Sequence, residues 1–205
     1  MKRLLIFGGS GFLGREIIKI ACKQYHVISV SRHGQPKEVE EWMSEIQWKK
    51  GDVFQTETWC HLLKEVDVVI DAVGLLIENP KKGMTYERFN IEPARITARK
   101  AQEMKVPHFV YISANQFTTL FLKRYFHSKA VAETLVLSYF PKALLVRPSF
   151  MYGKNRKLTT TQAKLIRLAK KVPLLSQPIK KLQPQNVEEV AQAIVIKIQE
   201  MTEKT

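Results

Sequence analysis

The stretch "LLIFGGSGFLGR", which runs from Leu4 to Arg15, decides the fold. A short apolar run ends in four closely spaced glycines, and an apolar pattern of helical spacing follows them. Glycine inside a strand or helix costs roughly 0.5–1 kcal/mol relative to alanine, so this concentration needs a structural or a binding reason. The apolar run predicts a strand buried on both faces, and the pattern after the glycines predicts a helix.

The same alternation of apolar runs and helical patterns continues to about residue 150. Further strands are expected at 26–32, 46–53, 67–74, 108–114 and 142–149, and helices at 11–25, 36–46, 56–66, 85–106 and 121–139. Thr56 is expected to cap the third helix, and Pro93 to mark a kink or a late start in the fourth. This alternation predicts an α/β fold, a doubly wound parallel sheet of the Rossmann type. Residues 1–205 are expected to form a single domain, with 150–205 as a small cap on its substrate side.

Three of the glycines, Gly8, Gly11 and Gly14, have the spacing G-x-x-G-x-x-G directly after the first strand. In this position the first allows a tight turn, the second lets the backbone approach a pyrophosphate, and the third lets helix and strand pack closely. The helix N-terminus, with Phe12 and Leu13 in its first turn, offers N–H groups and partial positive charge to phosphates. These residues predict a dinucleotide-binding site, and the alternative is a glycine-rich turn that binds nothing.

The end of the second strand indicates which dinucleotide is bound. An acidic residue there would hydrogen-bond the ribose 2′-hydroxyl of NAD. This chain instead has Ser31, Arg32 and His33. A guanidinium can pair with a 2′-phosphate and stack on adenine, so Arg32 favours NADP, with NAD as the second option. The alternative is a surface arginine in a basic protein.

The ends of the third and fourth strands are expected to complete the cofactor site. An acid and an apolar residue there can flank adenine, and small residues admit the ribose. The predicted residues are Asp52, Val53, Ala72, Val73 and Gly74. Asn90 is expected either to hydrogen-bond backbone around the cleft or to lie on a helix surface.

The sequence "YFHSK" places Tyr125 and Lys129 on one face of a helix, and Ser113 ends the preceding strand. A phenol has a pKa near 10, so it needs a neighbouring cation to act as an acid or base near neutral pH. Lys129 would supply this charge and hold ribose hydroxyls, while Ser113 would orient a substrate carbonyl or hydroxyl. Tyr125 would exchange a proton with the substrate oxygen as hydride is transferred. The alternatives are packing for Tyr125 and a strand-end cap for Ser113.

The formal net charge is +14, and part of the excess lies after residue 153. No aromatic residue follows Tyr152, so this basic region has no side chains on which single-stranded bases could stack. A solvated basic face is therefore favoured over nucleic-acid binding. Cys22 and Cys60 lack metal-ligand spacing and are expected to be buried free thiols. The apolar run before the glycines is too short for a secretory signal, nothing approaches a membrane span, and a cytoplasmic location is expected.

The segments "GGSGFLG", "YISA", "YFHSKAVAE" and "LLVRPSFMYG", in this order, resemble the short-chain dehydrogenase/reductase superfamily. They look most like its atypical and extended branches, the NAD(P)-dependent epimerase/dehydratase-like and NmrA-like proteins. The segment "LQPQNVEEVAQAI" looks like the late stretch in which these proteins bring a loop and a helix back beside the cofactor. The resemblance implies a Rossmann fold, bound NAD(P), and catalytic roles for Ser113, Tyr125 and Lys129.

The chain departs from the extended enzymes in two ways. Only 58 residues follow Arg147, which argues against a large sugar-nucleotide substrate, and Ser113 lies closer to Tyr125 than in most epimerases. Many atypical relatives are redox sensors or accessory subunits of larger complexes. The sequence thus predicts an NADP-dependent oxidoreductase with a small-molecule substrate, and the alternative is a non-catalytic NAD(P)-binding sensor or accessory protein. A protein partner or a homo-oligomer is left open.

Overall fold

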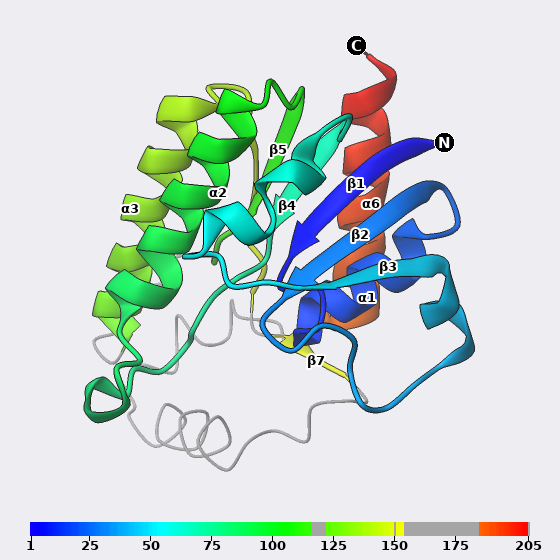
Figure 1. The fold of residues 1–205 in the computed structure, drawn as a ribbon. Coiled ribbons are helices and arrows are strands. Elements are labelled where there is room, and N and C mark those ends of the chain that lie inside the picture. The colour runs from blue at the N-terminus through cyan, green and yellow to red at the C-terminus, as the bar shows by residue number, and fades with distance from the viewer. Residues whose placement is uncertain (116–121, 150, 154–184, 205) are drawn as a thin grey trace.

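The computed structural model contains a parallel sheet of six strands (Figure 1). The strands are β1 (Lys2–Phe7), β2 (Tyr25–Ser31), β3 (Ile46–Lys50), β4 (Val68–Asp71), β5 (His108–Ile112) and β6 (Leu144–Val146). Their order is β3-β2-β1-β4-β5-β6, the predicted Rossmann arrangement. The order reverses between β1 and β4, and such sheets bind ligands in the crevice at that point, outside the carboxyl ends of the strands. The structure describes residues 1–115, 122–149, 151–153 and 185–204.

Two pairs of helices cover the two faces of the sheet (Figure 1). The pairs are α1 (Phe12–Ala21) with α6 (Val187–Glu203), and α2 (Glu92–Glu103) with α3 (Lys123–Tyr139). Because the strands are buried on both faces, alternate side chains enter different cores. Leu4 packs with the core under α1 and α6, whereas Leu5 packs with the core under α2 and α3. This two-sided burial is why the strands form nearly continuous apolar runs in the sequence.

Two predicted helices are replaced by shorter elements. Within 36–46, only Glu41–Glu45 is helical, as a 3-10 helix, because Glu40 is extended and its carboxylate accepts hydrogen bonds from Arg15 and Trp42. Within 56–66, two 3-10 helices cover Thr56–Thr58 and Cys60–Leu63. The predictions of two regular helices, and of Thr56 as a cap, were wrong, since Gln55 precedes the first 3-10 helix and makes no side-chain capping bond.

Trp59 explains the second departure. Its ring lies edge-on to Phe7 with the ring centroids 4.7 Å apart, and its indole Nε1 donates to the Asp52 carbonyl oxygen at 2.9 Å. The Trp59 backbone has φ of −138°, outside the helical range, so the segment breaks where this buried side chain is anchored. Tertiary packing therefore overrides the helical apolar spacing here.

Pro93 marks a late start, one of the two outcomes predicted for it. A π-helical turn, Glu87–Ile91, comes first, and α2 begins at Glu92 with the proline in its first turn. Proline is tolerated there because the first N–H groups of a helix have no intrahelical partner. The π-helical turn is an irregularity of the kind often found at functional sites.

The late part of the chain returns to the start of α1. Strand β7 (Met151–Tyr152) pairs in parallel with β8 (Gln185–Asn186), and the Asn186 side chain caps α6 by accepting from the Glu188 N–H. A Cβ on Gly153 would lie 2.5 Å from Val187 and 3.4 Å from the Phe12 ring, so these segments are in close contact. Most of the predicted cap, 154–184, lies outside the described residues.

Candidate dinucleotide and catalytic site

The glycine-rich turn has the geometry that its spacing predicts. Gly8 has φ of +83°, which favours glycine, and its N–H donates to the Val30 carbonyl oxygen at 3.1 Å. The Gly11 N–H donates to the Gly8 carbonyl oxygen at 2.9 Å, which closes the turn directly before α1. A Cβ on Gly14 would lie 2.3 Å from that same oxygen. Gly8 therefore permits the turn, and Gly14 allows α1 to pack closely against it.

A cavity of about 250 Å³ lies beside this turn, at the carboxyl ends of the central strands. Eight predicted cofactor residues line it, namely Gly8, Gly11, Arg32, Asp52, Val53, Ala72, Val73 and Gly74. Phe12, Leu13 and Gly14 do not line it. Leu13 is buried in the core, Phe12 packs against that core, and Gly14 supports the turn. The fold thus brings together three strand ends and the start of α1, as the sequence predicts.

Sequence reasoning missed part of the cavity wall. The additional residues are Ser10, Val30, Ser31, Gly51, Phe54, Arg88, Phe89 and Pro93, and His33 lines the cavity too. Arg15, at the start of α1, does not line the cavity and pairs with Glu40. No apolar period in the sequence marks Arg88 and Phe89 as cavity residues, because they lie on the π-helical turn Glu87–Ile91.

Of the two roles predicted for Asn90, the structure shows hydrogen bonds to backbone around the cleft and not a place on a helix surface. Its side chain is fully buried, and it accepts a hydrogen bond from the Leu75 N–H at 2.7 Å and donates to the Leu75 carbonyl oxygen at 3.1 Å. It also donates to the Ser128 hydroxyl at 3.0 Å. Asn90 therefore ties the loop after β4 to α3, as one of its two predicted roles requires.

Lys129 is buried beneath the loop after β4. Its Nζ donates to the Tyr111 hydroxyl at 3.1 Å and to the Ile112 carbonyl oxygen at 2.9 Å. A Cβ on Gly74 would lie 3.2 Å from this Nζ, so the ammonium group sits directly under a residue that lines the cavity. Burial lowers the pKa of Lys129 to about 8, although the nearby Asp71 and Glu133 carboxyls act to raise it. The group is therefore a cation at neutral pH.

Ser113 lies at the end of β5, next to the carbonyl group that Lys129 contacts. Its hydroxyl is buried near Glu133 and makes no fully formed hydrogen bond with a described residue. Burial acts to raise the pKa of Glu133, but Arg147 and the nearby Ser113 hydroxyl lower it overall. Glu133 and Arg147 form a two-point ion pair, with oxygen–nitrogen distances of 2.8 and 2.6 Å. Ser113 is thus held beside a carboxylate on the same helix as Lys129.

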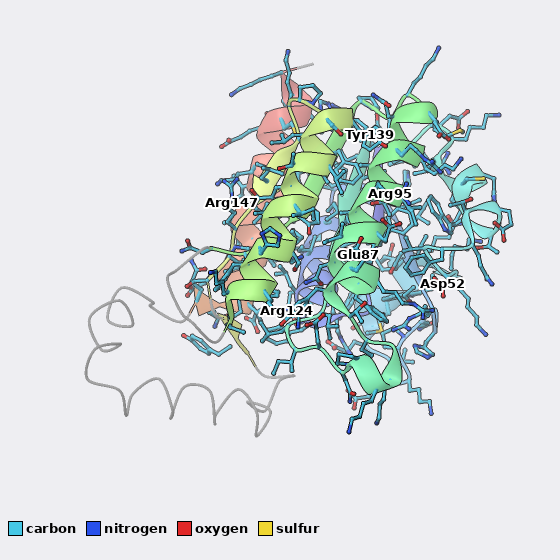
Figure 2. The ribbon with its side chains drawn as sticks, turned by 90° about the vertical axis from the view of Figure 1, so that its left-hand side faces the viewer. Asp52, Glu87, Arg95, Arg124, Tyr139 and Arg147 are labelled. Atoms are coloured by element: carbon cyan, nitrogen blue, oxygen red, sulfur yellow. The ribbon has the colours of Figure 1, made fainter. Side chains whose placement is uncertain are left out.

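Tyr125 lies one helical turn before Lys129 on α3 (Figure 2 shows this helix from Arg124 near its start to Tyr139 at its end). The Tyr125 ring is half-buried and packs against Phe126 and Tyr86, with ring centroids 5.2 and 5.9 Å apart. The structure thus brings Ser113 and Lys129 together at the end of β5. It places Tyr125 on the same helix within an aromatic cluster.

Asp71 is a further buried ionisable group near Lys129. Burial raises its pKa from 3.8 to about 6, against the lowering effects of the Val73 N–H, the Lys129 charge and the Thr97 hydroxyl. Because the folded protein holds this proton more tightly than the unfolded chain, Asp71 contributes stability that is present below about pH 4. That contribution is lost as the pH rises through about 6.

Asp71→Asn should remove this pH dependence. The free energy of unfolding of the wild type should fall relative to the variant by up to roughly 3 kcal/mol between about pH 4 and pH 7. Urea unfolding of both proteins across this range measures the difference. Parallel pH profiles for the two proteins would show that Asp71 does not titrate as described.

Other expectations concern metals, thiols and membranes. Within the described ranges, no group of three or more His, Cys, Asp or Glu side chains could hold a metal ion. Cys22 and Cys60 are free, as expected, but each is half-buried and not fully buried. Among the helices that the structure describes, none is long and apolar enough to span a membrane.

Curated relatives of this chain come from chloroplasts, mitochondria and a fungal complex. It is 31% identical to an uncharacterized chloroplastic protein of Arabidopsis thaliana, over 76% of this chain and 52% of that protein. It is 30% identical to MIOREX complex component 2 of Saccharomyces cerevisiae, over 75% of this chain and 74% of that protein. It is 26% identical to the mitochondrial NADH dehydrogenase (ubiquinone) 1 alpha subcomplex subunit 9 of Mus musculus, over 93% of this chain and 51% of that subunit. The chain thus spans about half the length of the plant and mouse relatives.

Solved structures confirm the fold, and a family model extends along most of the chain. MoeE5 in complex with UDP-glucuronic acid and NAD superposes with a TM-score of 0.64 at 19% identity, over 80% of this chain and 60% of that one. The UDP-glucuronic acid 4-epimerase of Bacillus cereus in complex with NAD gives 0.63 at 18% identity, over 84% and 65%. The model of the NAD(P)H-binding family matches residues 8–194. The chain therefore belongs to the NAD(P)H-binding family, which fits its resemblance to the atypical branch of the short-chain dehydrogenase/reductase superfamily.

Proposed function

We propose that this protein is an NADP-dependent oxidoreductase that transfers hydride between NADP(H) and a small carbonyl or alcohol substrate. The observation that carries the proposal is the buried Lys129 ammonium group, which lies directly beneath Gly74 at the cavity wall and beside the end of β5. Burying a cation is costly, so a structural role alone is a poor reason to place one there. A nicotinamide ribose above Gly74 would give that charge a ligand.

The residues present fit a dinucleotide. The cavity is lined by glycine backbone at the start of α1, where N–H groups suit a pyrophosphate, and by small residues after β4, where a ribose has room. A bound nicotinamide would supply or accept the hydride. Gly8 and Gly11 would hold the pyrophosphate, and Lys129 would donate hydrogen bonds to the ribose hydroxyls.

The proton transfer is assigned to Tyr125. In the reductive direction, Ser113 would donate a hydrogen bond to the substrate carbonyl oxygen and Tyr125 would give its phenolic proton to that oxygen. The Lys129 cation, one helical turn away, would stabilise the phenolate left behind. The oxidative direction reverses these proton movements. Residues 150–205 are proposed to complete the substrate side of the site.

NADP is proposed over NAD because of Arg32. Its guanidinium lines the cavity, and the end of β2 carries no acidic residue. A 2′-phosphate would find charge of the right sign at this wall, whereas the 2′-hydroxyl of NAD would lack its usual carboxylate partner.

A non-catalytic accessory protein is the second candidate. Two relatives are named as parts of complexes, the MIOREX component and the NADH dehydrogenase subunit, and Tyr125 packs in an aromatic cluster as a structural residue would. Such a protein would bind the dinucleotide to stabilise its fold or to report redox state to a partner.

Turnover distinguishes the two candidates. The full chain is mixed with NADPH and one small aldehyde or ketone at a time, taken from a panel of such compounds. The loss of NADPH absorbance is followed in each mixture. The oxidoreductase should oxidise NADPH with at least one compound well above the protein-free rate. Tight NADPH binding with no oxidation across the panel would favour the accessory protein.

A further inference from the structure

We propose that Arg88, on the π-helical turn, is a second selectivity residue for NADP, and that it binds the 2′-phosphate together with Arg32. This rests on the proposed binding of a dinucleotide in the cavity. No charge pattern at the end of β2 reveals it, because Arg88 lies more than 50 residues further along the chain. The fold brings it to the same wall.

Guanidinium and aromatic groups alternate around this end of the cavity. Arg32, after β2, lies over the Phe89 ring, with its guanidinium carbon 5.4 Å from the ring centroid. Arg88 lies over the Phe54 ring, after β3, at 5.7 Å. All four residues line the cavity. Each arginine therefore reaches from one segment to an aromatic face on another, and both guanidinium groups border the space where the adenosine half of a dinucleotide would lie.

The guanidinium groups of Arg32 and Arg88 are also available to bind an anion. Within the described residues, neither forms an ion pair or donates a side-chain hydrogen bond. Arg15, which lies nearby in sequence to the glycine turn, is by contrast paired with Glu40 at 2.5 Å. Stacking on an aromatic ring orients a guanidinium while leaving its edge N–H groups available. Two such groups suit a dianionic phosphate, which accepts several charge-assisted hydrogen bonds.

The backbone that carries Arg88 is fixed. Asn90 lies two residues after Arg88 in the same turn. Its side chain is fully buried and forms hydrogen bonds with both the N–H and the carbonyl oxygen of Leu75. The Arg88 N–H itself donates to the Thr85 hydroxyl at 3.3 Å. The π-helical turn thus presents Arg88 and Phe89 to the cavity while Asn90 holds the turn against the loop after β4. This anchoring reduces the conformational entropy lost when a ligand binds.

Ligand titrations of the full chain test the role of Arg88. NADPH, NADH, 2′,5′-ADP and 5′-AMP are titrated into the wild type, Arg88→Gln, Arg88→Ala and Arg32→Ala. Removing a charged hydrogen-bond partner of the phosphate should weaken NADPH and 2′,5′-ADP by about 10- to 100-fold in either Arg88 variant. Affinity for NADH and 5′-AMP should change by no more than about 3-fold, since these ligands lack the phosphate. Arg3→Ala, which removes a half-buried arginine at the start of β1 that is paired with Glu65, is the matched control and should bind all four ligands as the wild type does.

The results distinguish a failure of the role proposed for Arg88 from a failure of the proposed cofactor. If the wild type prefers NADPH and both Arg88 variants retain that preference, Arg88 has no role in selectivity and only this inference is overturned. An equal loss of NADPH and NADH in the variants would also overturn it, because it would indicate a general effect on the cleft. A wild type that binds neither NADPH nor 2′,5′-ADP overturns both the inference and the proposed cofactor. Arg88 is exposed in the wild type, so its replacement should leave the fold intact. Thermal unfolding of each variant verifies this.

Discussion

Tyr125→Phe should lower the rate of NADPH-dependent reduction by about 10²- to 10⁴-fold, the usual contribution of a positioned acid or base. The change removes one hydroxyl and keeps the ring, so the contacts of Tyr125 with Phe126 and Tyr86 should remain. NADPH affinity should stay within about 2-fold, because Lys129 and the glycine turn are untouched. The measurement is a comparison of turnover and of NADPH titration for the wild type and the variant.

Tyr86→Phe is the matched control for this prediction. The Tyr86 ring neighbours that of Tyr125, but its hydroxyl donates to the Leu76 carbonyl oxygen at 3.0 Å and the residue does not line the dinucleotide cavity. This variant should lose at most about 1 kcal/mol of stability, the value of one hydrogen bond, and keep its turnover. If Tyr125→Phe turns over as fast as Tyr86→Phe, the phenol has no part in the chemistry and the accessory role gains support.

Gly14→Ala should both destabilise the protein and weaken NADPH binding. The new Cβ would lie 2.3 Å from the Gly8 carbonyl oxygen and 2.9 Å from the Gly9 Cα, and neither backbone atom can turn aside as a flexible side chain could. Either α1 or the glycine turn has to move, and overpacking of this kind costs typically about 1–3 kcal/mol. Urea unfolding measures the loss of stability, and titration measures the loss of NADPH affinity.

Ser10→Ala provides the comparison within the same turn. Ser10 is exposed and already carries a Cβ, so its replacement should leave the free energy of unfolding unchanged within about 0.5 kcal/mol. Should Gly14→Ala prove as stable as Ser10→Ala, the close contact between α1 and the glycine turn would not be a constraint on the fold.

The fold was predictable because both faces of the sheet are buried. Each strand then forms an apolar run whose position needs no knowledge of its partners, and the glycine spacing marks where the first strand gives way to α1. The three 3-10 helices Glu41–Glu45, Thr56–Thr58 and Cys60–Leu63 were not predictable in this way. Their apolar spacing is helical, but the buried Trp59 and the ion pairs of Glu40 decide their backbone.

Some residues of the candidate site could also be predicted from the sequence, and others could not. Residues at strand ends could be placed from the sequence, because the carboxyl ends of parallel strands meet at one edge. Arg88 and Phe89 could not, since a π-helical turn has no distinct apolar period and these residues come from the far side of the switch point. The hydrogen bonds of Lys129 to Tyr111 and to the Ile112 carbonyl were also beyond the sequence, because Y-x-x-x-K spacing shows which helix face a lysine occupies and not what it meets.

The central claim is that the cavity beside the glycine turn binds NADP, and a calorimetric titration of NADPH and NADH into the wild-type chain tests it most directly. We expect one NADPH bound per chain, and an affinity at least about 10-fold higher than for NADH, as a charged phosphate contact would give. Equal affinities would contradict the assignment of NADP. No heat of binding with either nucleotide, and no displacement of one by the other, would contradict the site itself.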